Sequence, residues 1–518
     1  MVLTIFWLAV SVIVIAPGNL VITSHWADAL HLVDILDRMA QGQRPHLDFV
    51  TPIGELAFAP ISFLMTLGLP TGRAYLVAQI FLAGGLGAAA MSIALRRMAW
   101  GWAALFAVVI VILTIALVHG RPDFSLSINV HYNRWSWAIG FVILLAALLP
   151  PIKATSCEGV FIGAAMAALA LIKVTYFAAF LPLAVLGLLV TGQVRTLVLA
   201  FVTGLGIAVV LTFLWGVGYW RSYVDDLIYI ASSDVRPYAG GGLLRMITGV
   251  EMLAPTILTG VAVALLALNG LQRQAVLLVF TFLAGAYVSD QNAGFDPLFL
   301  GLVALLLVVW AKGLGPARRT AFLTVSVGLS VAIAPNIANL ASSPLRAAMA
   351  TRSGFVPMVI GSPRHQDILL ERNAALSGGQ YVLSLEGQRN FFGGQAPAPT
   401  VFRGEELPNC RSLVSPTYFA SIAADLSERD LAQGEAIFVA DYLSPLWLFG
   451  DHPPLNGAAP WSYGGLHGIE NAAFALFPVC PNREIVHRRM LDALEEIPMT
   501  EIVRTPLYRL YALEGSRP

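Results

Sequence analysis

Long apolar runs separated by short polar turns fill most of residues 1–340. An α-helix needs about 20 apolar residues to cross roughly 30 Å of hydrocarbon. The pattern predicts about eleven such helices, several of them short. They are expected near Leu3–Ile22, Ala74–Leu95, Trp100–Val118, Trp137–Leu149, Val160–Ile172, Tyr176–Val190, Thr196–Trp215, Pro255–Leu268, Ala275–Val288, Leu298–Trp310 and Thr320–Ala338.

The segment Ile53–Leu69 is also apolar, and counting it as a span would invert the topology of everything after it. Pro60 interrupts the segment, and Gly54 and Glu55 stand at its start, as in a helix lying along a membrane interface. If it does not span, basic turns nearly free of acids share one side, as cytoplasmic turns do. These turns hold Arg96, Arg97, Lys153, Arg195, Arg273, Lys312, Arg318 and Arg319. We therefore expect Ile53–Leu69 to lie on the outer face.

Residues 341–518 have the mixed composition of a soluble domain and no run long enough to span a membrane. An odd number of spans from a cytoplasmic start places them outside. The pattern predicts strands at Tyr381–Leu385, Ala436–Ala440 and Ile502–Leu513, the last a pair turned near Thr505, and helices at Thr417–Leu426 and Glu484–Leu494. We thus expect an α-helical polytopic membrane protein with a first outer loop at 23–73 and an extracytoplasmic C-terminal α/β domain at 341–518.

Composition supports this class and excludes others. Hydrophobic residues make up 57% of the chain, charged residues 12%, and the mean hydropathy is +0.74, whereas charged residues are about 25% of a soluble domain. The formal net charge is zero, so no basic surface indicates nucleic-acid binding. No Lys or Arg precedes the first apolar run, which favours a retained span over a cleaved signal peptide.

The three cysteines fit this placement. Cys410 and Cys480 fall in the outer domain, where a disulfide is permitted, although spacing alone does not show that they meet. Cys157 stands alone at a cytoplasmic turn. No Cys or His spacing typical of a metal site occurs.

The polar stretch Ser24–Gly54 interrupts the apolar pattern directly after the first run and carries four aspartates. Apolar residues recur in it at helical spacing, so a short helix is expected from Asp28 as its N-cap to Gly42 as its stop. Asp34 and Asp37 are expected on the solvated face of this helix, without a functional role. Asp48 follows in the tract QRPHLDFVTP.

These residues resemble the first outer loop of the GT-C superfamily of membrane glycosyltransferases, which use polyprenyl-phosphate sugars and include protein mannosyltransferases and aminoarabinose transferases. The shared features are an aspartate after the first span, a short helix ending in Gly, and Pro-x-x-Asp-Phe, here with HLDF from His46 to Phe49. TPIGEL stands where the family commonly has Pro-Pro-Leu. The resemblance implies that Asp28 matches the catalytic acidic position and Asp48 the second acidic position.

Sugar transfer from a polyprenyl phosphate to a hydroxyl needs a general base and groups that receive the departing phosphate. Asp28 is the candidate base, with helix capping as its alternative role. Asp48 is assigned either to catalysis through acceptor or metal contact, or to a structural turn.

Phosphate-binding candidates come from other outer segments. Lys173 interrupts the apolar stretch from Val160 to Val190, which is too long for one ordinary helix and fits two short helices joined by an outer turn. It is either a phosphate ligand or a turn anchor. The remaining candidates have interfacial anchoring, snorkelling or turn formation as alternatives, and Arg236 belongs to a predicted mobile lid at Gly216–Met252. They are His131, Tyr132, Asn133, Arg134, Arg236, Asn292 and Asp296.

The sequence therefore predicts a multi-pass plasma-membrane glycosyltransferase with an outward-facing site. Its partners would be a polyprenyl-phosphate-linked sugar, an envelope glycan, lipid or protein acceptor, and membrane lipids. We expect no cofactor, with a divalent cation left open. The main alternative is a transporter or flippase, although no paired broken helices in related halves are seen. A second alternative is a non-catalytic membrane subunit that binds a partner through its outer domain.

Overall fold

The computed structural model describes residues 1–120, 123–152, 155–233, 235, 242–292, 296–376, 400–407 and 415–514. The chain forms two compact units. The helical unit comprises Met1–Ala16, Leu76–Val217 and Pro237–Ala348, and the mixed unit comprises Pro17–Tyr75, Gly218–Arg236 and Met349–Pro518.

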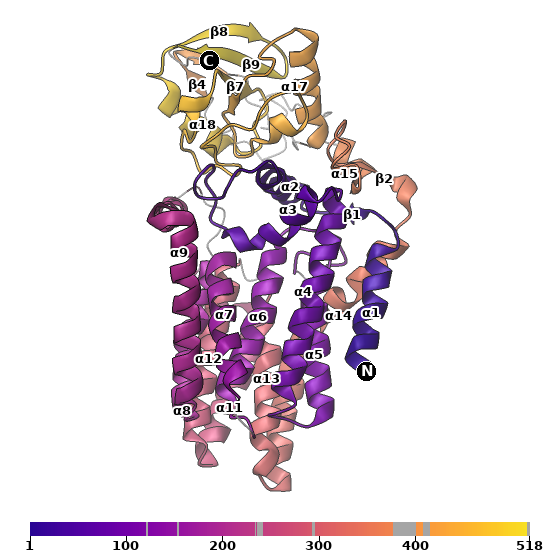
Figure 1. The fold of residues 1–518 in the computed structure, drawn as a ribbon, viewed down its shortest axis with the longest axis vertical. Coiled ribbons are helices and arrows are strands. Elements are labelled where there is room, and N and C mark those ends of the chain that lie inside the picture. The colour runs from indigo at the N-terminus through magenta and orange to yellow at the C-terminus, as the bar shows by residue number, and fades with distance from the viewer. Residues whose placement is uncertain are drawn as a thin grey trace. The chain divides into compact units, whose positions relative to one another are not determined.

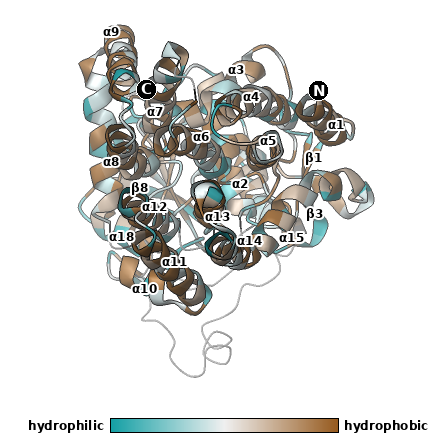
Figure 2. Cartoon of the chain, turned by 90° about the horizontal axis from the view of Figure 1, so that it is seen from below, coloured by the Kyte–Doolittle hydropathy of each residue, from teal (hydrophilic) through white to brown (hydrophobic). Residues whose placement is uncertain are grey.

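The helical unit consists of long apolar helices that run side by side (Figure 1). Seen end-on, these helices are coloured mainly as hydrophobic residues (Figure 2). Among them, α6 packs against α5, α7 and α8, and α12 packs against α8, α11 and α13. The bounds are α1 Val2–Ile15, α4 Thr71–Ala94, α5 Trp100–Ile115, α6 His131–Leu148, α7 Ser156–Ile172, α8 Val174–Val190, α9 Val194–Ala231, α10 Leu243–Thr248, α11 Val250–Leu268, α12 Gln272–Gln291, α13 Phe299–Trp310, η2 Ala311–Gly313 and α14 Pro316–Met349.

Each of the eleven predicted apolar segments overlaps one of these helices, but the first was predicted too long, because α1 ends at Ile15 and Leu20–Ile22 form strand β1. Among the described residues, four helices are long and apolar enough to cross a membrane, namely α4, α9, α11 and α14, and shorter apolar helices accompany them. The chain is thus a largely helical, multi-pass membrane protein. The number of crossings stays a prediction.

The break predicted at Lys173 is confirmed. Helix α7 ends at Ile172 and α8 begins at Val174, and the backbone of Lys173 between them is extended, with φ −155° and ψ 107°. The 17 residues of each helix span about 26 Å at 1.5 Å per residue. A side chain at this break can therefore be polar without lying in the middle of a long apolar helix.

The segment Ile53–Leu69 contains only the turn η1 (Glu55–Ala57) and the helix α3 (Ala59–Thr66). The eight residues of α3 extend about 12 Å. That length is too short to cross a bilayer, as expected from the sequence.

In its described residues, the mixed unit combines three small sheets with helices and short 3-10 turns. One sheet has the order β1-β3-β2, with β1 parallel to β3, and the largest has the order β6-β7-β9-β8, with β6 parallel to β7. The bounds are β1 Leu20–Ile22, α2 Trp26–Ala40, η3 Arg352–Gly354, β2 Phe355–Pro357, β3 Ile368–Glu371, α15 Arg372–Leu376, β4 Val401–Phe402, β5 Glu405–Glu406, α17 Pro416–Glu428, β6 Ile437–Val439, η5 Pro445–Leu448, η6 Ile469–Asn471, β7 Phe474–Pro478, α18 Glu484–Leu494, β8 Met499–Arg504 and β9 Tyr508–Leu513.

The predictions for the C-terminal elements largely hold. Strand β6 and the pair β8–β9 fall where strands were expected, and α17 and α18 fall where helices were expected. The predicted strand Tyr381–Leu385 lies outside the described residues. Cys480 is buried and takes part in a disulfide, while its predicted partner Cys410 lies outside the described residues. Cys157 is free and exposed.

Two expectations about the outer segments were wrong. The predicted lid Gly216–Met252 is helical as far as Ala231, because α9 continues beyond a kink at Gly216, whose φ is 80°. Helix α2 begins at Trp26, after His25 in the left-handed conformation, so Asp28 lies in its first turn and is not its N-cap. Gly42 follows the end of the helix with a φ of 96°, as predicted for a stop residue.

Candidate functional site

A lysine cluster lies in the helical unit at the break between α7 and α8. The Lys173 ammonium donates to the amide oxygens of Asn133, at 2.7 Å, and Asn292, at 2.6 Å. The amide nitrogen of Asn292 donates in turn to the hydroxyl of Tyr176 at 2.8 Å. Lys173 also lies 5.4 Å from the ring centroid of Tyr132 and 5.8 Å from that of Tyr176. Three segments that the sequence indicated separately therefore meet around one cation.

Asp296 lies beside this cluster, in the turn between α12 and α13. Its carboxylate accepts the indole N–H of Trp137 at 2.8 Å, while its other oxygen is buried and has no partner in the described structure. Burial raises the pKa of Asp296 to about 7, and the Trp137 hydrogen bond and the charge of Lys173 act against that rise. The side chain is thus a carboxyl group that can exchange a proton near neutral pH.

The other members of the predicted polar stretch face the interior of the helical unit. His131 is fully buried and its ring packs 4.7 Å from that of Trp135. The guanidinium of Arg134 donates to the carbonyls of Val118 and Asn129. Arg134 therefore supports the backbone that precedes α6, and we do not place it in the lysine cluster. Arg236 lies outside the described residues.

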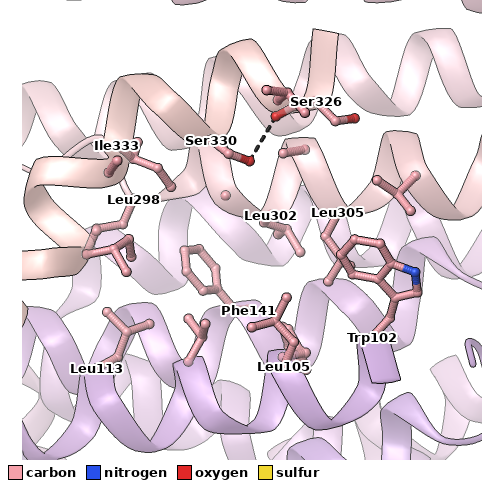
Figure 3. A pocket seen from close by; sticks show the side chains of 18 of the residues that line it. Trp102, Leu105, Leu113, Phe141, Leu298, Leu302, Leu305, Ser326, Ser330 and Ile333 are labelled. Atoms are coloured by element: carbon pink, nitrogen blue, oxygen red, sulfur yellow. Dashed lines mark hydrogen bonds between the residues drawn. The ribbon is translucent and has the colours of Figure 1, made fainter. Parts of the chain in front are cut away.

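An apolar cavity of about 520 Å³ adjoins the same region of the helical unit. Side chains of α5, α6, α13 and α14 line it, and Figure 3 shows leucines, Phe141 and Trp102 turned toward it. Ser326 and Ser330 also line it, but both hydroxyls donate to carbonyls within α14, at 2.9 and 2.8 Å. Phe141 packs 5.3 Å from Trp137, the partner of Asp296. The cavity suits an apolar chain and offers no free hydrogen-bond donor at these serines.

In the mixed unit, Asp28 is half-buried and lies near Tyr442. Burial raises the pKa of the Tyr442 hydroxyl, and the nearby Tyr463 and the negative charge of Asp28 add to that rise, while Arg483 opposes it. The ring of Tyr442 lies 5.2 Å from that of Trp461, which in turn lies 4.6 Å from that of His31. Tyr442, which the negative charge of Asp28 reaches, is thus part of a chain of three packed aromatic rings.

The sequence did not indicate Tyr442, Trp461 or Arg483. One signal was present, because Asp441 and Tyr442 directly follow the predicted strand Ala436–Ala440, and ligand sites often lie at the carboxyl ends of parallel strands. Nothing local marks Trp461 or Arg483.

Asp48 has a local partner. Its carboxylate accepts the backbone N–H of Arg44 at 2.6 Å, and its carbonyl accepts the N–H of Gly457 at 2.7 Å. These contacts are those of a side chain that closes a turn, which was one of the two roles considered for Asp48.

Asp34 and Asp37, expected to be solvated, are buried instead. Asp34 pairs with Arg38 at 2.6 Å and accepts the indole N–H of Trp447 at 3.1 Å. Asp37 pairs with Arg364 and lies 3.6 Å from His365. Residues from beyond position 360 therefore cover the face of α2 that the sequence pattern marks as polar.

His46 forms a buried contact that the sequence did not predict. Its Nδ1 lies 2.7 Å from the carboxylate of Asp226, which also accepts the backbone N–H of Thr51 at 3.1 Å. The imidazole ring lies 4.4 Å from the ring of Tyr223. Within the mixed unit, the HLDF tract is thus held against the helical continuation of α9. In the described part of the chain, no group of three or more His, Cys, Asp or Glu residues could hold a metal ion.

Two solved structures are similar to this chain. One is ArnT from Cupriavidus metallidurans bound to undecaprenyl phosphate, at 10% identity and a TM-score of 0.39, with 99% of this chain and 97% of that chain covered. The other is the same protein in the apo state, at 12% identity and a TM-score of 0.38, with 99% and 96% covered. No protein-family model and no curated protein matches.

Proposed function

We propose that this chain is an inverting glycosyltransferase that moves a sugar from a polyprenyl-phosphate carrier to a hydroxyl of an envelope glycan, lipid or protein. It would act at the outer face of the plasma membrane through about eleven spans, with residues 341–518 outside. The observation that carries the proposal is the lysine cluster, because a cation among apolar helices is costly and its usual explanation is functional.

In this reaction Asp28 takes the proton from the acceptor hydroxyl, whose oxygen attacks the anomeric carbon of the sugar. The bond between that carbon and the phosphate oxygen breaks, and the phosphate leaves with the electron pair. A single displacement inverts the anomeric configuration. Lys173 would stabilise the charge that develops on the phosphate, because amide oxygens hold its ammonium in place without cancelling its charge.

The apolar cavity supports a carrier with an isoprenoid chain. Apart from its two serines it is lined by apolar side chains and one glycine, and it adjoins the Trp137–Asp296 pair through Phe141. A carrier chain in this cavity would place its phosphate near the Trp137–Asp296 pair, beside the lysine cluster.

The test uses purified full-length protein in detergent with a polyprenyl-phosphate sugar carrying a radiolabelled hexose, and it measures release of label from the lipid. Asp28→Asn should lower kcat about 10²–10⁴-fold, the usual range for loss of a positioned base. Asp225→Asn is the matched control and should leave kcat unchanged. Asp225 is exposed, and its distance of 3.9 Å from Arg221 makes their ion pair weak.

Lys173→Met should lower kcat/KM for the donor about 10–100-fold, the equivalent of the roughly 1.5–3 kcal/mol of a hydrogen bond to a charged group. Lys312→Met, at an exposed position in η2, should not. Equal turnover by wild type and Asp28→Asn would show that Asp28 is not the general base. Vesicles in which the protein moves the labelled lipid between leaflets without cleaving it would establish the flippase alternative instead.

A further inference from the structure

A recognition surface lies in the mixed unit where strand β6 ends. The antiparallel bridge between Leu443 and Trp461 holds two chain segments together, and the N–H of Ser462 donates to the carbonyl of Tyr442 at 2.9 Å. The backbone therefore fixes Tyr442 and Trp461 as neighbours. Their rings lie 5.2 Å apart at 73°.

Asp441 fixes the third member of this surface. Its buried carboxylate accepts the backbone N–H of Asn482 at 2.7 Å and of Arg483 at 3.3 Å. These residues directly precede α18, so Asp441 ties the start of that helix to the end of β6. The guanidinium of Arg483 consequently lies 5.4 Å from the ring centroid of Tyr442.

Arg483 has an unmet positive charge within the described structure. It is half-buried. Asp441 contacts its backbone N–H, and its guanidinium forms no ion pair with a carboxylate among the described residues. Arg bears five N–H donors in a planar fork that matches carboxylate and phosphate groups. A partly desolvated guanidinium beside an aromatic face is therefore suited to bind an anion.

Two buried donor or acceptor atoms point to a polar ligand as well. The indole nitrogen of Trp461 and Nε2 of His31 are both buried without a hydrogen-bond partner in the described structure, although most buried polar atoms have one. His31 is 7% exposed, and burial lowers its pKa to about 3, so the ring is neutral. Trp461 and Asp28 are only half-buried, so part of each side chain reaches the surface.

We propose that Trp461, Tyr442 and Arg483 form an acceptor subsite that binds a sugar ring carrying a carboxylate or phosphate group. The apolar C–H face of the sugar would pack on Trp461, its hydroxyls would use the indole N–H and His31, and its anionic group would pair with Arg483. Asp28, in the same unit and close to Tyr442, would then face a hydroxyl of the bound sugar. This inference rests on the proposed function for its role as an acceptor site, but the binding itself does not require transfer.

The binding test uses the purified full-length chain in detergent and follows tryptophan fluorescence. The probes are a galacturonic acid trisaccharide, glucose 6-phosphate and a neutral cellotriose. Wild type should bind at least one anionic probe about tenfold or more tightly than cellotriose. Arg483→Gln should raise the Kd for that anionic probe about 10–100-fold and the Kd for cellotriose less than about threefold. The probe that binds identifies the anionic group as carboxylate or phosphate.

Controls separate this subsite from general effects. Arg429→Gln removes an exposed arginine of the same unit, paired with Asp425, and should bind like wild type. Trp461→Phe keeps an aromatic face but removes the N–H, and should weaken the binding of both anionic and neutral sugars. Equal effects of Arg483→Gln and Arg429→Gln, or cellotriose binding as tight as both anionic probes, would overturn the proposal.

Donor turnover separates the failure of this inference from the failure of the proposed function. Anionic-sugar binding that depends on Arg483, in a protein that never releases sugar from the lipid donor, would keep the subsite and reject the transferase. Donor turnover that depends on Asp28, with no Arg483-dependent sugar binding, would keep the transferase and reject the subsite.

Discussion

The Asp34–Arg38 pair in α2 offers the sharpest test of how the first loop is stabilised. Both side chains are 1% exposed. Arg38 donates to Asp34 at 2.6 Å, to the carbonyl of Leu455 at 2.8 Å and to Gln43 at 3.1 Å. Arg38→Met would leave the Asp34 carboxyl buried without its cation. Breaking a buried ion pair in this way costs about 3–5 kcal/mol.

The expected shift follows from the size of the mixed unit. For a unit of about 150–250 residues, 1 kcal/mol moves Tm by about 2–4 °C, so Arg38→Met should lower the Tm of the purified chain in detergent by roughly 6–20 °C. The double variant Asp34→Leu with Arg38→Met should recover most of this loss, because an apolar pair of similar volume often replaces a buried ion pair at little cost.

The pH dependence of the Arg38→Met variant adds a second measurement. Burial raises the pKa of Asp34, and the charge of Arg38 opposes that rise. Without Arg38 the pKa rises further, so the folded state holds a proton that the unfolded state releases above about pH 4. Stability that the bound proton provides at low pH is lost as the pH rises. The variant should therefore be closest to wild type near pH 5 and furthest from it near pH 8.

The chain contains a matched control. Asp425 and Arg429 have the same i,i+4 spacing on α17, at 2.9 Å, but their side chains are 23% and 48% exposed. Surface pairs contribute about 0–1 kcal/mol, so Arg429→Met should change Tm by at most a few degrees. If Arg38→Met and Arg429→Met lowered Tm equally, the burial argument for α2 would be wrong.

Three further predictions concern packing and charge. Gly163→Ala should lower Tm in detergent by the equivalent of about 1–3 kcal/mol, because its new Cβ would lie 2.2 Å from a backbone oxygen of α9, whereas Gly206→Ala, with open space around it, should not. Glu158→Gln should cost about 3–5 kcal/mol, since it removes the carboxylate that holds buried Arg97 at 3.0 and 2.7 Å, and an unchanged Tm would refute that. Burial raises the pKa of Asp441 from 3.8 to about 7, so its contribution to stability is lost as the pH rises from about 4 to about 7. Asp441→Asn should flatten the fall in Tm over this range, and a curve parallel to that of the wild type would contradict this.

Apolar periodicity predicted the helices because a membrane helix is specified locally, by the length and hydrophobicity of one segment. The break at Lys173 was predictable for the same reason, since an apolar stretch too long for one helix and interrupted by a cation favours two. For Lys173, Asn133 and Asn292, the sequence predicted only that all three lie on the same side of the membrane. It did not predict that they come into contact. Which polar residues on that side come into contact depends on helix packing, which the sequence pattern does not contain.

The sequence did not predict the burial of side chains whose neighbours come from distant segments of the chain. Asp34 occupies a polar position on α2, and a helix face with charged residues normally faces solvent. Here Trp447, more than 400 positions away, donates a hydrogen bond to Asp34, and the equally distant Leu455 accepts one from its partner Arg38. The same limit applies to Trp461 and Arg483, which approach Tyr442 only through the sheet and the bridge that follow β6.

The four aspartates of the first loop therefore have separate roles. Asp34 and Asp37 anchor α2 to Trp447 and Arg364, and Asp48 closes a turn. Asp28 lies in the first turn of the same helix, beside Tyr442. Because α2 is a continuous helix of 15 residues, anchoring its middle fixes the direction in which its first turn presents a carboxylate. The acidity of the loop is thus explained mainly by stabilisation, and the chemistry proposed for the chain needs only the one aspartate whose position the others hold.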